Sequence, residues 1–167
     1  MHVLICVGED GAALAPVLAE AWREAAPRCD VETVVLPGPA PATDAASAGV
    51  PGLASPGVFV PLDALGLSTV AGAQGRAESA LAGPAGRADL VVVHVPALDG
   101  TSLREGPVQA AVATAGPRAV PVVVLAGRSE VSRREWSGAG VSGVHETGTD
   151  VPASTARVAR TWAPSWA

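Results

Sequence analysis

Three short runs of almost purely apolar residues constrain the fold of this chain more than any other feature. They are residues 3–7 (VLICV), 90–95 (LVVVHV) and 120–125 (VPVVVL). A strand with one face in water alternates apolar and polar residues, whereas a uniformly apolar strand is buried on both faces. Segments with helical spacing of apolar residues separate these runs. We therefore predict an α/β fold, a Rossmann-like three-layer sandwich with a mostly parallel sheet.

Weaker signals complete the alternation of strands and helices. Further strands are predicted at residues 31–36, 58–60 and 141–145, and helices at 14–25, 73–81, 106–115, 132–139 and 154–162. Residues 37–57 are rich in Pro, Gly, Ala and Ser, and this composition predicts a flexible linker. The length of 167 residues predicts one domain, 1–167, that contains this linker.

Charge and composition exclude several classes of protein. The net charge is −5, all 11 basic residues are Arg, and no basic run occurs, so we do not expect nucleic-acid binding. No stretch of about 18 consecutive apolar residues predicts a membrane span. Two cysteines make no disulfide framework, and the first residues carry no basic leader, so we expect a cytoplasmic protein.

Candidate site residues follow the apolar strands, because ligands of such sheets bind beyond the carboxyl ends of the strands. Glu9 and Asp10 come after the first strand. Paired carboxylates there could bind Mg²⁺ or act as a base, and they equally suit the N-terminus of a helix, where the helix dipole favours negative charge. The spacing of glycines matches neither a dinucleotide-binding nor a Walker phosphate loop.

The loops after the other two apolar strands offer similar alternatives. Asp99 could position a nucleophile or a metal, or it could serve as a turn residue or helix cap. Gly127 would let the backbone approach an anion and Arg128 could pair with that anion, or the two form a tight turn. The spacing of His and Cys residues predicts no metal site, and we interpret His94 as a buried core side chain and Cys6 as an inert buried thiol.

Residues 89–93, 98–104 and 120–127 resemble the C-terminal part of the two-domain bacterial glycerate kinases. That family carries a segment of the type DLVxTGEGRxDxQSLxGK, then a helix, then VPVxxLAG; residues 139–141 resemble its next turn. Residues 3–5, 22–23 and 26–27 follow the first strand and helix of the family. The resemblance covers about residues 1–36 and 85–145, and it implies the same α/β fold.

The glycerate kinase family phosphorylates glycerate with ATP, and this sequence lacks several residues of the family's motifs. The family motif PDSFKGSLSA falls on residues 7–15, where Gly8 replaces the acidic residue and Gly11 replaces the Lys. Only Thr43 remains of a DGGEGT motif, and Glu105-Gly106 replaces a Gly-Lys pair, whereas Asp99 and Ser102 are retained. The resemblance thus implies a short, degenerate member that lacks the inserted second domain of the family.

We therefore expect a non-catalytic domain that binds a small organic acid or a protein partner. Its expected ligand-binding residues are Glu9, Asp10, Asp99, Ser102, Gly127 and Arg128. One alternative is an active small-acid kinase in which Asp99 and Asp10 are catalytic, and only then is Mg-ATP an expected cofactor. The other is an unrelated nucleotide-binding α/β module of the universal-stress kind.

Overall fold

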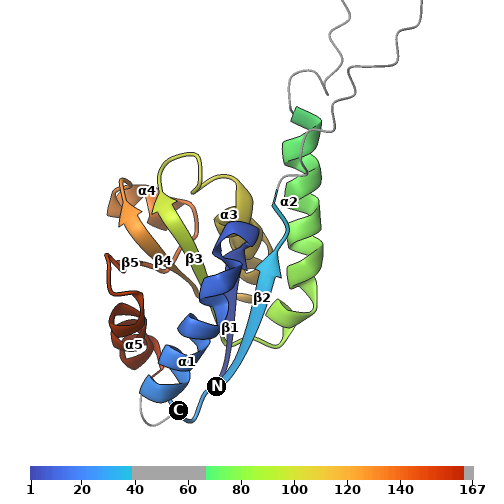
Figure 1. Cartoon of the computed structure of the whole chain (residues 1–167). Helices are drawn as coiled ribbons and strands as arrows, with labels where there is room; N and C mark the ends of the chain where they lie inside the picture. The colour runs from blue at the N-terminus through green and yellow to red at the C-terminus, as the bar shows by residue number, and fades with distance from the viewer. Residues whose placement is uncertain (39–66, 164–167) are drawn as a thin grey trace, which may run out of the picture.

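Five parallel strands form one sheet in the computed structural model, which describes residues 1–38 and 67–163. They are β1 (His2–Gly8), β2 (Asp30–Leu36), β3 (Leu90–Leu98), β4 (Val122–Ser129) and β5 (Gly143–Glu146). Their order across the sheet is β2-β1-β3-β4-β5, and every neighbouring pair is parallel (Figure 1).

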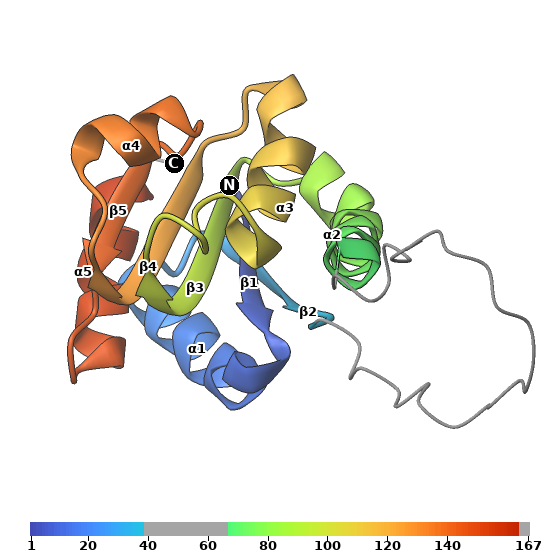
Figure 2. The ribbon, with the colours of Figure 1, turned by 90° about the horizontal axis from the view of Figure 1, so that it is seen from above.

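Helices cover both faces of the sheet (Figure 2). On one face lie α1 (Ala15–Ala25) and α5 (Val151–Trp162), and a short 3₁₀ helix, η1 (Glu9–Leu14), leads from β1 into α1. On the other face lie α2 (Leu67–Ala82), α3 (Gly106–Ala115) and α4 (Arg133–Gly138). The predicted three-layer α/β sandwich with a parallel sheet is confirmed.

A separate apolar core fills the space on each face, because successive side chains of a strand point to opposite sides. In β3, Val91 and Val93 pack beneath α2 and α3. Leu90 and Val92 of the same strand belong to the core beneath α1 and α5. Both sets are fully buried, so every position of the run must be apolar, and this requirement explains the absence of alternation in the sequence.

Local capping signals fix where helices begin. The Ser132 side chain accepts a hydrogen bond from the Glu135 amide, and the Glu135 carboxylate accepts one from the Ser132 amide at 2.8 Å, which makes a capping box at the start of α4. The predicted last helix begins earlier than expected, at residue 151. The carboxylate of Asp150 caps it by accepting a bond from the Ala153 amide at 3.0 Å.

Other boundaries differ modestly from the sequence predictions. The helix predicted at 73–81 begins at residue 67. The helix predicted at 14–25 corresponds to α1, which has Pro16 in its first turn, and the sequence did not predict the 3₁₀ helix η1 that precedes it. The last strand occupies residues 143–146. Most of the predicted linker, residues 39–57, and the strand predicted at 58–60 lie outside the described residues.

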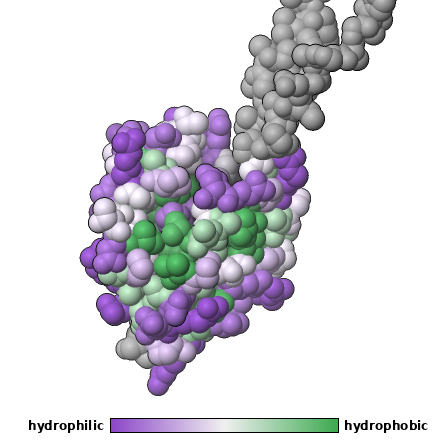
Figure 3. Space-filling model, in the orientation of Figure 1, coloured by the Kyte–Doolittle hydropathy of each residue, from purple (hydrophilic) through white to green (hydrophobic). Residues whose placement is uncertain are grey.

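The surface of the described residues is mainly polar. Figure 3 shows hydrophilic residues over much of one face and apolar residues gathered in its middle. Among the described residues, Val17 of α1 and Val35 of β2 are the large hydrophobic side chains that remain exposed. None of the helices described in the structure combines the length and the apolar character that a membrane span requires.

The two cysteines are expected to differ sharply in reactivity. Burial inside β1, aided by the nearby Glu32 carboxylate, raises the pKa of the Cys6 thiol to about 12. Because the thiolate is the reactive form, Cys6 should resist alkylation in the native protein, whereas the partly exposed Cys29 should react. Iodoacetamide labelling followed by peptide mass spectrometry measures this difference. Labelling of both thiols at the same rate before unfolding would contradict the burial of Cys6.

Candidate functional site

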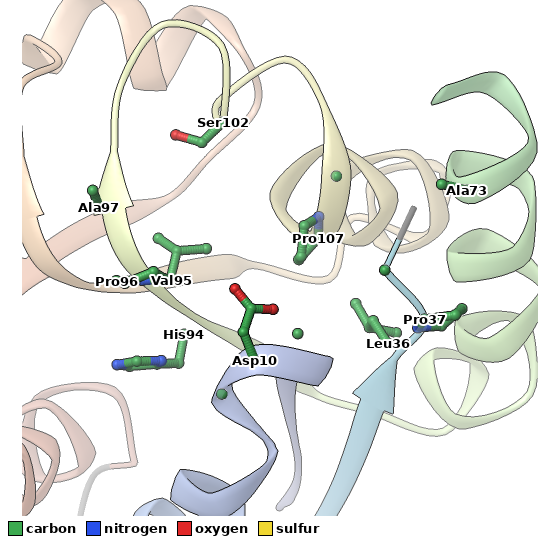
Figure 4. A pocket seen from close by; sticks show the side chains of 14 residues that line it. Asp10, Leu36, Pro37, Ala73, His94, Val95, Pro96, Ala97, Ser102 and Pro107 are labelled. Carbon is green, nitrogen blue, oxygen red and sulfur yellow. The ribbon is translucent and has the colours of Figure 1, made fainter. Parts of the chain in front are cut away.

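A crevice forms where successive strands are added in opposite directions from β1, the topological switch point of the sheet. The chain passes from β1 to β2 on one side of the sheet and later returns to add β3 on the other side of β1. The connections that leave β1 and β3 therefore diverge, and ligands of open α/β sheets bind at such a point. A cavity of about 290 Å³ lies there, at the carboxyl ends of β1, β2 and β3 (Figure 4).

The cavity is formed by five separate parts of the chain. Its lining comes from the start of η1, the end of β2, the last half of β3 with its following loop, the first turn of α3, and Ala73 of α2. Most of this lining is apolar or backbone, and its polar side chains are Asp10, His94 and Ser102. A second cavity of about 340 Å³ shares part of the lining and adds four polar residues, namely Gln74, Asp99, Thr101 and Glu105.

Asp10 projects from the start of η1 into the cavity (Figure 4). Its carboxylate forms no hydrogen bond or ion pair with any residue that the structure describes. A Cβ atom added at Gly8 would lie 3.1 Å from Asp10 Oδ1 and 3.9 Å from Pro107 Cγ. The carboxylate thus lies close to the first turn of α3, where the helix dipole stabilises negative charge.

His94 is also in the lining of this cavity, with its ring directed away from Asp10 (Figure 4). It lies near the carboxyl end of β3, pairs in register with Val7 and Leu125, and is only 6% exposed. Its ring makes no hydrogen bond with any part of the chain that is described. Burial lowers the pKa of its imidazole, so the ring is neutral at pH 7, with one nitrogen as donor and the other as acceptor.

The burial of His94 agrees with our interpretation of it as a core side chain, but its place in the cavity was missed. The signal in the sequence is a polar residue next to the end of an otherwise apolar strand, at the edge where ligands bind. That signal is weak by itself, because a buried histidine can also be satisfied by neighbouring groups within a core.

Asp99 holds the loop after β3 in shape. Its Oδ1 atom accepts hydrogen bonds from the amides of Thr101, at 2.9 Å, and Ser102, at 2.7 Å. The hydroxyl of Ser102 also donates to Oδ1, at 3.0 Å. The bonds from Ser102, and then the bond from Thr101, lower the pKa of the Asp99 carboxyl. This geometry is that of a turn residue, one of the two alternatives that the sequence left open.

The remaining candidates lie at the rim of the site or outside it. Glu9 is exposed, and its Oε2 atom would be 3.0 Å from a Cβ added at Gly38, which places its side chain at the rim. Arg128 is exposed at the end of β4 and forms an ion pair with Glu130 at 2.9 Å. The structure thus brings Asp10 and Ser102 together, with Glu9 and Asp99 nearby, whereas Gly127 and Arg128 line neither cavity.

Gly127 has a structural reason to be glycine. A Cβ atom at this position would lie 2.4 Å from the backbone carbonyl oxygen of Pro96, on the neighbouring strand β3. Such a separation is far inside van der Waals contact and involves backbone that cannot rotate away. The close approach of β3 and β4 therefore accounts for the residue without an anion.

Metal ligation and known relatives give no further assignment. Within residues 1–38 and 67–163, no group of three or more His, Cys, Asp or Glu side chains is placed to hold a metal ion. No protein-family model matches the chain, and neither does any curated protein.

Substitutions of Asp99 test its role in the loop. Asp99→Ala removes the acceptor of three hydrogen bonds and should lower the melting temperature, whereas Asp99→Asn keeps an oxygen acceptor and should lower it less. The lowered pKa means that the charged form stabilises the fold. The advantage of wild type over Asp99→Asn should be full above the ordinary pKa of 3.8 and disappear as the pH falls through the lower folded-state pKa. Thermal unfolding across this pH range measures it, and an Asp99→Ala melting temperature equal to wild type would refute the role.

Replacing each of two glycines by alanine, in separate variants, tests the close approach of β3 and β4. Gly127→Ala should lower the free energy of unfolding by about 1–3 kcal/mol, because the added methyl group meets fixed backbone. Gly138→Ala in α4 is the matched control, since its added Cβ meets nothing within 4 Å. The control should be neutral or stabilise by up to about 1 kcal/mol. Urea unfolding compares the two, and equal stabilities would contradict the contact.

Proposed function

We propose that this chain is a non-catalytic, glycerate-kinase-like domain that binds a small organic molecule in the cavity at the carboxyl ends of β1, β2 and β3. The observation that carries the proposal is the cavity itself. It lies where the sheet reverses its winding, and its apolar walls surround a few polar groups. Small-molecule sites in proteins have this construction, because apolar walls bind the body of the ligand and polar groups orient it.

The charges around the cavity favour binding over phosphoryl transfer. Kinases neutralise the transferred phosphoryl group with Lys, Arg and Mg²⁺. This chain contains no Lys, and neither cavity is lined by an arginine among the described residues. Where the sequence resembles glycerate kinases, Gly11 replaces the Lys of the family motif. The nearest polar side-chain atom to Gly11 is Nδ1 of His94, which would lie 3.8 Å from a Cβ atom added at Gly11.

The two alternative functions receive less support from the site. A divergent kinase would need Arg128 to neutralise phosphate, yet Arg128 lies outside the cavities and is paired with Glu130. A nucleotide-binding module needs a backbone cradle for the phosphates. The start of α3 offers a poor one, because Pro107 in its first turn has no N–H to donate.

A cavity-filling variant tests the proposal. A thermal-shift screen of small organic molecules, including glycerate, ADP and Mg-ATP, should give ligands that raise the melting temperature, since a ligand stabilises by RT ln(1 + [L]/Kd). Ala97→Leu places a larger side chain in the cavity and should abolish these shifts. Ala113→Leu is the matched control, because Ala113 is exposed on α3 outside both cavities, and it should keep them.

Two results would overturn the proposal. The first is a screen that finds no ligand, or that finds only ligands which bind Ala97→Leu as well as they bind the wild type. The second is glycerate-dependent ADP release by the wild-type protein at about 1–100 s⁻¹, the usual range of kinases.

A further inference from the structure

A contact between two aromatic rings joins the end of α5 to the edge strand β5. Trp162, the last residue of α5, donates a hydrogen bond from its indole Nε1–H to Nε2 of His145, at 3.0 Å. The rings are nearly perpendicular, with centroids 6.5 Å apart. The indole lies against Gly143, where an added Cβ would be only 2.7 Å from Trp162 Cζ2. Gly143 thus leaves space for the indole, and His145 supplies the acceptor that holds it.

This hydrogen bond fixes the protonation state of His145. An indole nitrogen can only donate, so Nε2 of His145 accepts and carries no proton, and the ring is neutral with its proton on Nδ1. Burial, and then the positive charge of Arg157, lower the pKa of the His145 imidazole, so the neutral form persists at pH 7. Protonation would put an N–H on Nε2, where it would face the N–H of the indole, and two donors cannot bond to each other.

The charges around His145 also oppose its protonation. Among the described residues, Arg157 of α5 is the charged group that acts on the ring. Glu146 follows in β5, but successive side chains of a strand point to opposite faces, and its carboxylate accepts a hydrogen bond from the end of β4 at 2.7 Å. Leu125 of β4 lies beside His145 in register, and His94 of β3, whose pKa is lowered by burial, lies beyond Leu125. The charged residues of α4 lie on the opposite face of the sheet.

The last turn of α5, residues 159–162, depends on this bond for its polar attachment to the sheet. The first turn has an attachment of its own, because the Ser154 hydroxyl donates to the Thr147 carbonyl at 3.0 Å. The recorded bonds of Thr161 and Ala163 stay within the helix. Helix ends open at a lower free energy than the core of a protein, so loss of the Trp162 bond should appear as local opening of this turn.

We propose that His145 and Trp162 form a pH-sensitive latch. The latch fastens the last turn of α5 to β5 while His145 is neutral, and protonation of Nε2 releases that turn. It lies beside β5, whereas the cavity lies at the ends of β1, β2 and β3, so the inference stands independently of the proposed function.

The sign of the pH dependence follows from the direction of the shift. The pKa of His145 is lower in the folded protein than its ordinary value of 6.5, so the fold favours the neutral ring. The stability that the latch contributes is therefore full above pH 6.5 and is lost as the pH falls through the lower folded-state pKa. Acid, and not alkali, opens the latch.

NMR of the full chain follows the latch directly. The ¹⁵N shifts of the imidazole should place the proton on Nδ1 of His145 at neutral pH, and an acid titration should then show where the ring is protonated. Amide exchange in residues 159–162, corrected for the intrinsic effect of pH, should become about tenfold faster on protonation, the effect of one lost hydrogen bond. The amides of α3, on the other face of the sheet, should keep their protection.

Three variants separate the latch from general effects of acid. His145→Gln keeps an acceptor that does not titrate, so residues 159–162 should stay protected at both pH values. Trp162→Phe keeps a ring over Gly143 without an N–H, so exchange there should be fast at both. His94→Gln is the matched control, because it removes the other histidine of the same row and should keep the wild-type response. Melting temperatures establish that the variants are folded.

Several outcomes would overturn the latch. They are a proton on Nε2 of His145 at neutral pH, no titration of His145 before the whole protein unfolds, and exchange in residues 159–162 that does not change on protonation. An equal acceleration in His145→Gln, or its loss in His94→Gln, would assign the pH response to another group and count equally against the proposal. The measurements on the wild type decide the question for any variant that does not fold.

Discussion

β1 and β3 pair in parallel in the middle of the sheet, Val3 with Leu90 through Val7 with His94. Both strands are buried on both faces, so their side chains build the two cores at once. Because β2 lies on the far side of β1 and β4 on the far side of β3, this one pairing fixes the order of the other strands and the place where the winding reverses. The candidate site is a consequence of it, since the connections that leave the two strands diverge there.

The site joins a rigid frame to a few polar side chains. The backbone around it is set by strand ends, by the turn that Asp99 closes, and by the first turn of α3. Asp10 and His94 take no part in this scaffold, because neither is hydrogen-bonded to any described residue. Asp99, Thr101 and Ser102, by contrast, both hold the turn after β3 and line a cavity.

Charge decides between the functions that this geometry allows. The fold by itself supports many chemistries, so the side chains at the site must carry the argument. The absence of lysine, and of arginine side chains among the described residues that line the two cavities, weighs against phosphate chemistry. The fold does not depend on these charges, because the strands are held by buried apolar residues.

The sequence by itself determined the elements whose causes are local. The apolar runs specify doubly buried strands, Ser132 and Glu135 specify the start of α4, and the place of Cys6 within the first run specifies a buried thiol. It also indicated that candidate residues follow the strands, and this suffices to place Asp10 and Ser102 at one edge of the sheet.

Only the tertiary structure decided which of those candidate residues lie in the same cavity. His94 and Asp10 line one cavity because β3 pairs with β1, a contact between segments far apart in the chain that no local pattern encodes. Arg128 is directed to Glu130 instead, and Gly127 is glycine because the carbonyl of Pro96 on the neighbouring strand leaves no room for a side chain. Strand neighbours and the distances between them follow from packing of the whole sheet, so the sequence supplied the candidates and only packing could select among them.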